Sequence, residues 1–273
     1  MARIASIGLT GNTVFMGVPH FHSGGETVHA TDFHEELGGK GFNQAVAAAR
    51  QGAETALLTA VGMDDVAKVR DFLANEGIAG TVVGKDVPSA HATILTDGTG
   101  ETRVTVFPGA RLDVADVEQF KQAIASADIL LLTNEVPEEV NLRASEIAAA
   151  NDTRIVFNPA PARPLPDVLK RRVFLFTPNE FETAGLEDVR CEVVETLGAK
   201  GCRIRSTGEV VPAVPCGEAV DSTGAGDTFN AVLAVRLAGG EEIPEACRAA
   251  NEAAAKSVTV RYVLPSIPRM VPD

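Results

Sequence analysis

Asp221-Ser222-Thr223-Gly224-Ala225-Gly226-Asp227-Thr228-Phe229 is the most informative stretch of this 273-residue chain, because it indicates both a local conformation and a chemistry. It leads into a long apolar run over residues 229–237 that is typical of a buried helix. A turn of small residues before a helix points backbone N–H groups and the positive end of the helix dipole toward one place. Such a place binds anions, and Gly224, Ala225 and Gly226 let a phosphate approach the backbone closely. The stretch therefore predicts a phosphate site at the start of a helix.

Asp227 lies beside this predicted anion site, in the first turn of the helix. A carboxylate there would repel a phosphate, so its presence needs a reason. As a general base it would take the proton of an attacking hydroxyl while the backbone amides hold the charge that develops on the phosphate. The alternative is an acidic residue that only stabilises the helix N-terminus.

A second glycine-rich stretch, Leu37-Gly38-Gly39-Lys40-Gly41-Phe42-Asn43-Gln44-Ala45, opens another predicted helix over residues 41–51. It lacks the G-x-x-x-x-G-K-[ST] pattern of a Walker A loop. Neither that pattern nor the G-x-G-x-x-G pattern of dinucleotide-binding folds occurs anywhere in the chain. A P-loop fold and a dinucleotide-binding fold therefore both lose support. Taken alone, the stretch is equally well a plain turn before a helix.

A third stretch, Thr177-Pro178-Asn179-Glu180-Phe181-Glu182, directly follows a predicted strand. Asn179 and Glu182 are three residues apart and share a face if the segment is helical. One amide oxygen and one carboxylate suit a Mg²⁺ site that works through water. The alternative is a helix N-cap with the glutamate as its capping-box partner.

Predicted strands and helices alternate along the chain. Apolar runs predict strands over residues 3–8, 55–61, 129–133, 154–158, 173–177 and 192–197. Helical periodicity predicts helices over residues 41–51, 64–76, 113–127 and 138–150. This alternation is typical of an α/β protein in which a mostly parallel central sheet has helices on both faces.

Two segments interrupt the alternation. Residues 12–35 are rich in glycine, histidine and threonine, and residues 90–107 predict a hairpin turned at Asp97-Gly98-Thr99-Gly100. Both predict antiparallel strands inserted in the α/β body. They would form a lid over the carboxyl edge of the sheet, where open α/β folds bind ligands. The alternatives are a structural flap or a dimer contact.

Composition excludes several classes of protein. The 24 basic residues stand against 37 acidic ones, and the net charge of −13 argues against binding to nucleic acid or to anionic membranes. No apolar run is long enough to span a membrane, and no signal peptide precedes the first strand. The length fits one large domain over residues 1–273. The four widely spaced cysteines predict reduced thiols and hence a cytoplasmic protein.

His20 and His22 form the only His-x-His pair in the chain. In a strand their side chains would point to one face and could bind a metal, but no third ligand is evident. The alternatives are a contact with the substrate and an uninvolved surface position.

The two glycine-rich stretches resemble the two signatures of the ribokinase-like sugar kinases, the PfkB family. They lie in the family's order and about 180 residues apart. Residues 25–28, 157–166, 177–180 and 196–201 also match the family pattern, so the resemblance covers nearly the whole chain. It implies a ribokinase-like three-layer αβα fold with a small β-sheet lid. It also implies transfer of the γ-phosphoryl group of ATP to an alcohol of a sugar or a sugar-like small molecule, with Mg²⁺ and, in many members, K⁺.

The resemblance also implies roles for individual residues. Asp227 matches the catalytic base, and the anion hole matches Gly224, Ala225 and Gly226. The Mg²⁺–water motif matches Asn179 and Glu182. Positions that contact the nucleotide match Thr196, Gly198, Gly201 and Asn251. Positions that hold the sugar match Gly39, Lys40, Asn43 and Glu135, with Asn12 as a displaced candidate. Positions near the monovalent-cation site match Asp221, Thr223 and Ser266.

The sequence departs from the family in three places. Family members carry an Asn-x-Asp pair after the first strand, whereas Thr13 stands here near the place of the missing carboxylate, which argues against ribose as the acceptor. The stretch between Glu182 and Thr196 lacks a helix that relatives have, and we expect only a short helix over residues 180–186. Tyr262 replaces a small residue beside the predicted cation loop, which weakens the case for K⁺.

Two other functions remain open from the sequence. One is a nucleoside kinase of the same fold, in which His20, Phe21 and His22 would stack on a base. The other is a catalytically impaired binding or regulatory protein, suggested by the three departures. Edge strands of the predicted lid could also pair with a second copy, which favours a homodimer.

Overall fold

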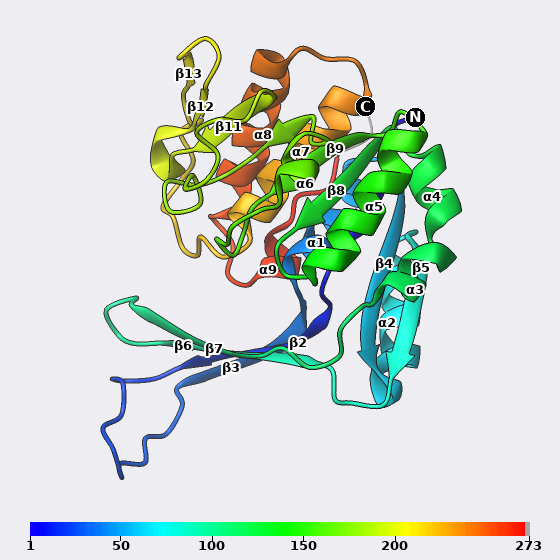
Figure 1. The fold of residues 1–273 in the computed structure, drawn as a ribbon. Coiled ribbons are helices and arrows are strands. Elements are labelled where there is room, and N and C mark those ends of the chain that lie inside the picture. The colour runs from blue at the N-terminus through cyan, green and yellow to red at the C-terminus, as the bar shows by residue number, and fades with distance from the viewer. Residues whose placement is uncertain (271–273) are drawn as a thin grey trace.

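The computed structural model of the chain describes residues 1–270, which form two β-sheets and their surrounding helices (Figure 1). The larger sheet has nine strands in the order β13-β12-β11-β10-β9-β8-β1-β4-β5. These are β1 (Arg3–Ile7), β4 (Glu54–Gly62), β5 (Ala79–Lys85), β8 (Ile129–Thr133), β9 (Arg154–Asn158), β10 (Leu175–Phe176), β11 (Glu192–Thr196), β12 (Cys202–Ile204) and β13 (Val210–Val211). Every pair from β5 to β11 is parallel, and β12 and β13 run antiparallel to their neighbours. The mostly parallel sheet expected from the sequence is confirmed.

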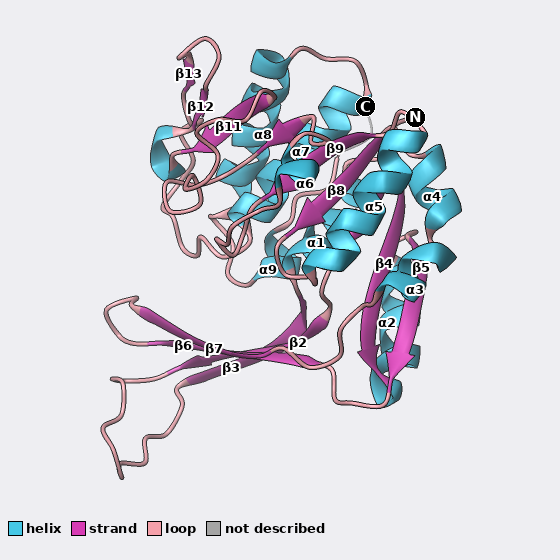
Figure 2. Cartoon of the chain, viewed as in Figure 1, coloured by secondary structure: helices cyan, strands magenta, loops and turns pink. Residues whose placement is uncertain are grey.

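Helices cover both faces of this sheet (Figure 2). One layer holds α1 (Lys40–Arg50), α2 (Val66–Asn75), α7 (Ala225–Ala238) and α8 (Ile243–Ser257). The other holds α3 (Val114–Gln119), α4 (Lys121–Ser126), α5 (Glu138–Ala150) and α6 (Asp167–Lys170). Successive side chains of β1 point to opposite faces, so Ile4 belongs to the first of two buried cores and Ile7 to the second. The three-layer αβα fold is therefore confirmed.

The helix expected over residues 113–127 is two helices rather than one. Phe120, whose ψ is near 1°, separates α3 from α4 and buries its ring in the core. Asp113 and Asp116 form a capping box at the start of α3. The helix expected over residues 64–76 begins with a 3-10 turn, η1 (Met63–Asp65). The helix α8 was not predicted, although its buried residues Ala246, Cys247, Ala250 and Ala253 recur at helical spacing.

The short helix expected over residues 180–186 is absent, and that prediction is wrong. Residues 177–191 join the parallel strands β10 and β11 through turns alone. The side chain of Glu182 accepts hydrogen bonds from both Asn179 N and Asn179 Nδ2, which closes a tight turn there. Gly185 then adopts a positive φ of 82°, which a continuing helix cannot accommodate. The buried Leu186 still covers the end of the second core.

The smaller sheet has four strands in the order β3-β2-β6-β7 (Figure 1). They are β2 (Gly11–Gly17), β3 (Asp32–Gly38), β6 (Ala90–Thr96) and β7 (Thr102–Phe107). The β2–β3 and β6–β7 pairs are antiparallel as expected, but β2 and β6 pair in parallel. The parallel pair arises because β2 follows β1 and β6 follows β5, so both leave the same edge of the larger sheet. We call this element the small sheet.

The C-terminal part is only partly as expected. The proline-rich sequence of residues 266–273 predicts an extended tail. The tail starts later, because Ser266 ends a short helix, α9 (Val263–Ser266), and residues 271–273 lie outside the described residues. Among residues 1–270, no helix combines the length and the apolar character needed to cross a bilayer.

Candidate active site

The candidate site lies at the carboxyl edge of the parallel sheet, on the side of the small sheet (Figure 1). Glu135 follows β8, Asn179 follows β10, and Lys40 begins α1 directly after β3. Carboxyl ends of parallel strands meet at one edge of a sheet, and open α/β folds bind ligands there. The topology thus brings together side chains from segments far apart in the sequence.

Asp227 is the most deeply buried charged group of this site, with 6% of the residue exposed. Its Oδ2 accepts a hydrogen bond of 2.9 Å from Asn43 Nδ2, and its Oδ1 accepts one of 3.3 Å from Gln44 Nε2. Burial raises the pKa of Asp227, while the charge of Lys40 and the two amide hydrogen bonds oppose that rise. The sequence did not predict a role for Gln44; the only available signal was its place directly after Asn43.

Lys40 and Glu135 complete a compact charged cluster. Glu135 Oε2 accepts a hydrogen bond of 2.6 Å from the backbone N–H of Lys40. Burial raises the pKa of Glu135 to about 7, and the nearby Asp227 carboxylate adds to this while Lys40 opposes it. The pKa of Lys40 is raised mainly by Asp227, against the effect of burial, and further by Glu135 and Glu182. One ammonium group therefore lies among three carboxyl groups.

The start of α7 has the small-residue turn before a helix that the sequence predicts for a phosphate site. Gly224 is the N-cap of α7 in the left-handed conformation, with φ 77°. A Cβ at Gly224 would lie 2.5 Å from Val263 Cγ1, so only glycine fits there. A Cβ at Gly226 would meet nothing within 4 Å, so open space adjoins the backbone at that position. An anion can occupy such a space against the N-terminal N–H groups of α7.

Asn179 and Glu182 are brought together, as expected. Asn179 Nδ2 lies 2.9 Å from Glu182 Oε1, and Asn179 Oδ1 accepts a hydrogen bond from the backbone N–H of Phe181. This is the side-chain pairing of a capping box, although no helix follows it. The charge of Glu182 also raises the pKa of Lys40.

The residues expected to contact a nucleotide lie around β11, β12 and β13. The backbone N–H of Thr196 donates to Pro178 O at 2.9 Å, and Gly198 has a positive φ of 57° with open space beside it. Gly201 has a φ of 94° and packs tightly on the backbone of Val211. Asn251, on α8, donates to the same Val211 carbonyl at 3.0 Å.

Asn12 is not brought into this cluster. Its Nδ2 donates to Asp65 Oδ2 at 3.2 Å, and its Oδ1 accepts from Lys68 Nζ at 2.7 Å. Its neighbour Thr13 lies on the other face of β2, with Oγ1 against Gly38. Thr13, which stands near the place of the family's carboxylate, is thus beside the glycine-rich stretch.

The residues expected near a monovalent cation come from two segments, one directly before α7 and one around α9 (Val263–Ser266), and these segments meet at Tyr262. Asp221 Oδ1 accepts a hydrogen bond of 2.9 Å from Thr223 N, and Asp221 Oδ2 accepts one of 3.0 Å from Tyr262 N. Ser266 Oγ donates to Val263 O at 2.8 Å. All three side chains therefore lie near the start of α7.

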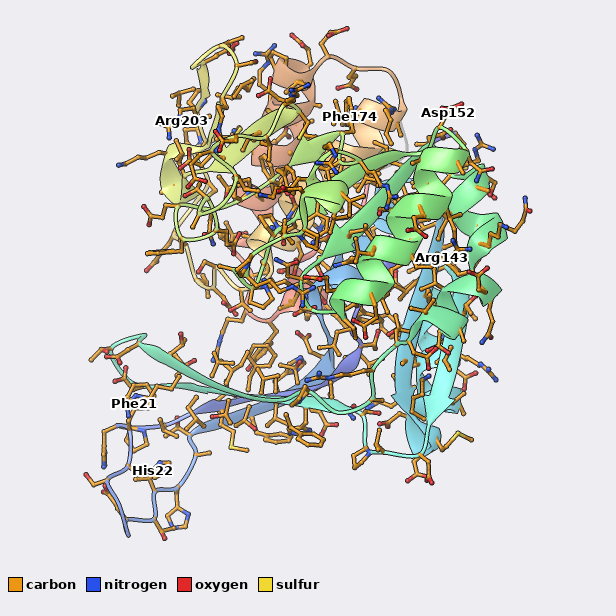
Figure 3. All side chains as sticks on the ribbon, in the orientation of Figure 1. Phe21, His22, Arg143, Asp152, Phe174 and Arg203 are labelled. Atoms are coloured by element: carbon orange, nitrogen blue, oxygen red, sulfur yellow. The ribbon has the colours of Figure 1, made fainter. Side chains whose placement is uncertain are left out.

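The His20–His22 pair lies in a loop rather than in a strand, so the assumed shared face is wrong. His20 Nε2 is hydrogen-bonded to Glu26 Oε1 at 2.7 Å, and Arg103 lies 4.0 Å above the ring of Phe21. Figure 3 shows Phe21 and His22 on the loop that extends beyond the small sheet. Residues 1–270 contain no group of three His, Cys, Asp or Glu side chains placed to hold a metal ion.

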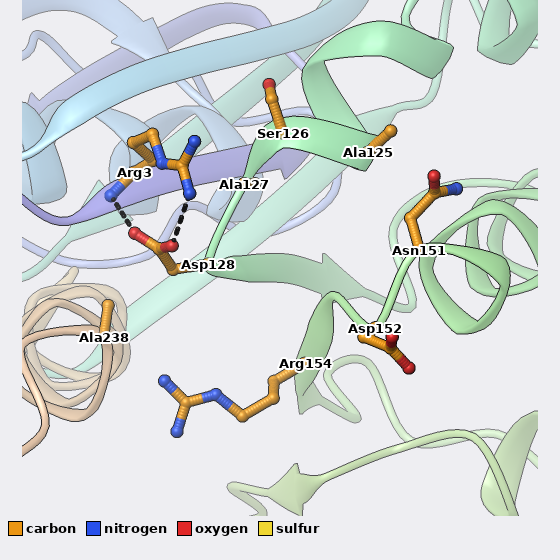
Figure 4. Close-up of a pocket in the computed structure, with 9 residues that line it drawn as sticks. All are labelled: Arg3, Ala125, Ser126, Ala127, Asp128, Asn151, Asp152, Arg154 and Ala238. Carbon is orange, nitrogen blue, oxygen red and sulfur yellow. Dashed lines mark hydrogen bonds and ion pairs between the residues drawn. The ribbon is translucent and has the colours of Figure 1, made fainter.

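A cavity of about 380 Å³ lies at the opposite edge of the larger sheet (Figure 4). It is lined by Arg3, Asp128 and Arg154, which stand at the amino ends of β1, β8 and β9. Arg3 and Asp128 are paired at 2.9 Å, and Arg154 donates to Leu237 O. The cavity is therefore separate from the charged cluster around Asp227.

Comparisons with known proteins agree with this fold. A family model described as pfkB family carbohydrate kinase matches residues 1–270. The ribokinase of Haemophilus influenzae is 34% identical over 279 aligned positions, which span 93% of this chain and 91% of that protein. The ribokinase of Bacillus subtilis is 35% identical over 257 positions, spanning 86% of this chain and 85% of that protein. The structure of a Thermotoga maritima ribokinase matches with a TM-score of 0.87 at 30% identity and covers 98% of this chain and 97% of that one.

Proposed function

The chain belongs to the pfkB family of carbohydrate kinases and uses ATP to phosphorylate a sugar, and we propose that Asp227 is the general base of this reaction. The observation that carries the proposal is the position of Asp227. Its buried carboxylate stands in the first turn of α7, beside backbone N–H groups and the open space at Gly226.

Proton transfer follows from the surroundings of Asp227. Asn43 and Gln44 hold its two oxygens in a fixed orientation, and burial raises its pKa toward the working range of a general base. As the hydroxyl oxygen of the sugar attacks the γ-phosphorus, its proton moves to the Asp227 carboxylate. The N–H groups at Gly224, Ala225 and Gly226 stabilise the charge on the transferring phosphoryl group, and ADP leaves.

The sugar binds between the small sheet and the start of α1. Lys40 and Glu135 present a donor and an acceptor to its hydroxyls, and Gly39, which packs closely on the backbone of Leu9, lies directly before Lys40. Asn43 uses its amide nitrogen on Asp227, while its buried Oδ1 has no partner and is free to accept from a hydroxyl. In this arrangement the small sheet, built from segments 12–35 and 90–107, acts as a lid that keeps water from ATP.

The nucleotide lies along β11 to β13, at Thr196, Gly198, Gly201 and Asn251. Asn179 and Glu182 would hold Mg²⁺ through water, and their amide and carboxylate oxygens are suitable ligands. When bound, the ion supplies positive charge to the phosphates. A monovalent cation such as K⁺ would lie at Asp221, Thr223 and Ser266, and comparing turnover with and without K⁺ tests this assignment.

Two further proposals concern the molecule as a whole. The protein works in the reducing cytoplasm, which the four free thiols support. It forms a homodimer through the small sheet, for which the exposed edge of β7 is the supporting feature.

The experiment is an ADP-release assay with Mg²⁺-ATP over pentoses, hexoses, sugar acids, sugar phosphates and nucleosides. We expect turnover on a sugar, and we expect Asp227→Asn to lower kcat by about 10²- to 10⁴-fold with ATP binding retained in calorimetry. Asp71→Asn, at an exposed position on α2, is the control and should match the wild type. If the kcat of Asp227→Asn is unchanged, Asp227 is not the base. Turnover on nucleosides alone would show that the acceptor is a nucleoside and not a sugar.

A further inference from the structure

Tyr262 has a backbone conformation that bulky residues rarely adopt. Within residues 1–270 only Asp152 and Tyr262 combine a positive φ with a side chain, and Tyr262 has φ 68° and ψ 162°. A conformation of this kind costs on the order of 1–3 kcal/mol and persists only where the surroundings hold it. The contacts of Tyr262 therefore have to account for its presence.

The side chain of Tyr262 binds the small sheet. Its ring stacks on His34 of β3, with the ring centres 3.9 Å apart and an angle of 18° between the planes. The edge of the Phe15 ring, on β2, meets it at 5.3 Å. Its hydroxyl donates to Asp32 Oδ2 at 2.6 Å, and Arg261 pairs with the same carboxylate at 2.7 Å.

The backbone around Tyr262 binds the opposite side of the site. The N–H of Tyr262 donates to Asp221 Oδ2 at 3.0 Å, in the loop that leads into α7. The side chain of Val263 packs directly on Gly224, the N-cap of α7. The N–H of Val263 also donates to Glu36 Oε1 at 2.9 Å, so the same segment contacts β3. One short segment thus contacts both the small sheet and the phosphate site.

We propose that Tyr262 is a positioning residue that fixes the small sheet relative to the start of α7 and thereby sets the geometry of the sugar site between them. The inference rests on the proposed function of that site. β3 runs directly into Gly39 and Lys40, so the position of β3 decides where the groups that hold the sugar stand. Asp227 is fixed to α7 on the other side. A sheet that is held only part of the time lowers the apparent affinity for the sugar by the fraction of molecules in which it is in place.

The strain at Tyr262 makes this role distinguishable from a simple contribution to stability. Glycine at this position relieves the positive φ and removes the ring, and these two changes act on the free energy of unfolding with opposite sign. The affinity for the sugar responds only to the loss of the ring. Phenylalanine keeps the stack on His34 and removes only the hydrogen bond to Asp32.

The test compares Tyr262→Gly, Tyr262→Phe and the control Phe33→Ala. Phe33 is an exposed aromatic residue on β3, one position away from Asp32, and its side chain lies on the other face of the small sheet from His34. For Tyr262→Gly we expect the KM of the sugar to rise about tenfold, because a stacked and hydrogen-bonded contact is lost. The KM of ATP should change less than about twofold. Tyr262→Phe should lie between this variant and the wild type, and Phe33→Ala should match the wild type.

Hydrogen exchange provides a second measurement that does not depend on activity. Amides of β2 and β3 should exchange about tenfold faster in Tyr262→Gly, while those of β8 and β9 remain unchanged. If the wild type turns over no sugar, the proposed function fails while this comparison still decides the role of Tyr262. Equal exchange in β2 and β3, or a rise in both KM values that follows a loss of stability, would overturn the proposal.

Discussion

Three carboxyl groups and one ammonium group share the candidate site, and their charges cannot all be satisfied at once. Lys40 is the cation that Asp227, Glu135 and Glu182 all face. Burial makes a second uncompensated negative charge costly, so a proton is held within the cluster near neutral pH. Burial raises the pKa of Glu135 to about 7, and it raises the pKa of Asp227 as well.

Stability should consequently depend on pH through Glu135. Its carboxyl binds a proton more tightly in the folded chain, because burial raises its pKa from 4.5 to about 7. The resulting stabilisation is complete below about pH 4.5 and is lost as the pH rises through about 7. Between about pH 5 and pH 8 the wild type should lose on the order of 2 kcal/mol relative to Glu135→Gln, a value reduced for its partial exposure.

Urea denaturation of both proteins across this pH range measures the difference. Glu138→Gln, three residues further along at an exposed position, is the matched control and should keep the pH dependence of the wild type. If Glu135→Gln and the wild type show the same slope, Glu135 is not the group that holds the proton.

At the level of single residues, sequence reasoning is most specific where a residue type has few possible partners. A carboxylate next to an anion site predicts Asp227 as the base, and Asn43, which was predicted to hold the sugar, donates a hydrogen bond to that carboxylate. Gln44 was missed because adjacent residues on a helix are not expected to share a target, yet a carboxylate has two oxygens and accepts from both. Asn12 was predicted as a displaced sugar contact but lies on the face of β2 that contacts Asp65 and Lys68, because the face of a strand is not known until its pairing is known.

Among the elements, the connection over residues 177–191 is the least regular part of the larger sheet. It joins two parallel strands without a helix, so few side chains are available to cover that end of the second core. Leu186 has 1% of its surface exposed and packs in the same core as Phe176 and Val193. Phe181, five residues earlier, is 79% exposed.

Leu186→Ala should therefore lower the free energy of unfolding by about 2–4 kcal/mol, the usual result of removing a fully buried leucine side chain. Phe181→Ala removes a larger side chain from the same connection and should change it by less than about 0.5 kcal/mol. Denaturant titration of both variants provides the comparison. Equal effects would mean that the turns, and not Leu186, cover the core.

The elements that sequence predicted well are those with an unambiguous start signal. The glycine-rich stretches before α1 and α7 gave both helices within a few residues. The prediction of a helix over residues 180–186 was wrong because the Asn179–Glu182 pair is the same whether a helix or a single turn follows it. The break at Phe120 between α3 and α4 was missed because Val117, Phe120 and Ile124 are all buried in the second core at helical spacing, so their periodicity does not indicate it.

At the scale of the molecule, few contacts set the position of one sheet relative to the other. On one face of the small sheet, Asn12 contacts Asp65 and Lys68 beside α2. On the other face, β3 contacts Tyr262 and the residues after it. The outer strand, β7, has no such anchor, and all six of its residues are exposed.

The unpaired edge of β7 predicts that the protein is a dimer in solution. Edge strands normally carry charges or proline against further pairing, whereas β7 reads Thr-Arg-Val-Thr-Val-Phe, with its single charge placed over the ring of Phe21. Val104 and Val106 point to the same face and are 57% and 56% exposed. An open backbone edge beside two exposed valines suits pairing with the same strand of a second copy.

Sedimentation velocity should accordingly give the mass of two chains for the wild type and of one chain for the double variant Val104→Lys/Val106→Lys. The introduced ammonium groups would face each other across the paired sheets, where like charges directly opposite destabilise the pairing. Val210→Lys/Val214→Lys adds the same charge at other exposed valines and should leave the dimer intact. A monomeric wild type, or a dimer that survives the β7 substitutions, would show that the small sheet is not the interface, and its exposed edge would then serve only to close over the sugar.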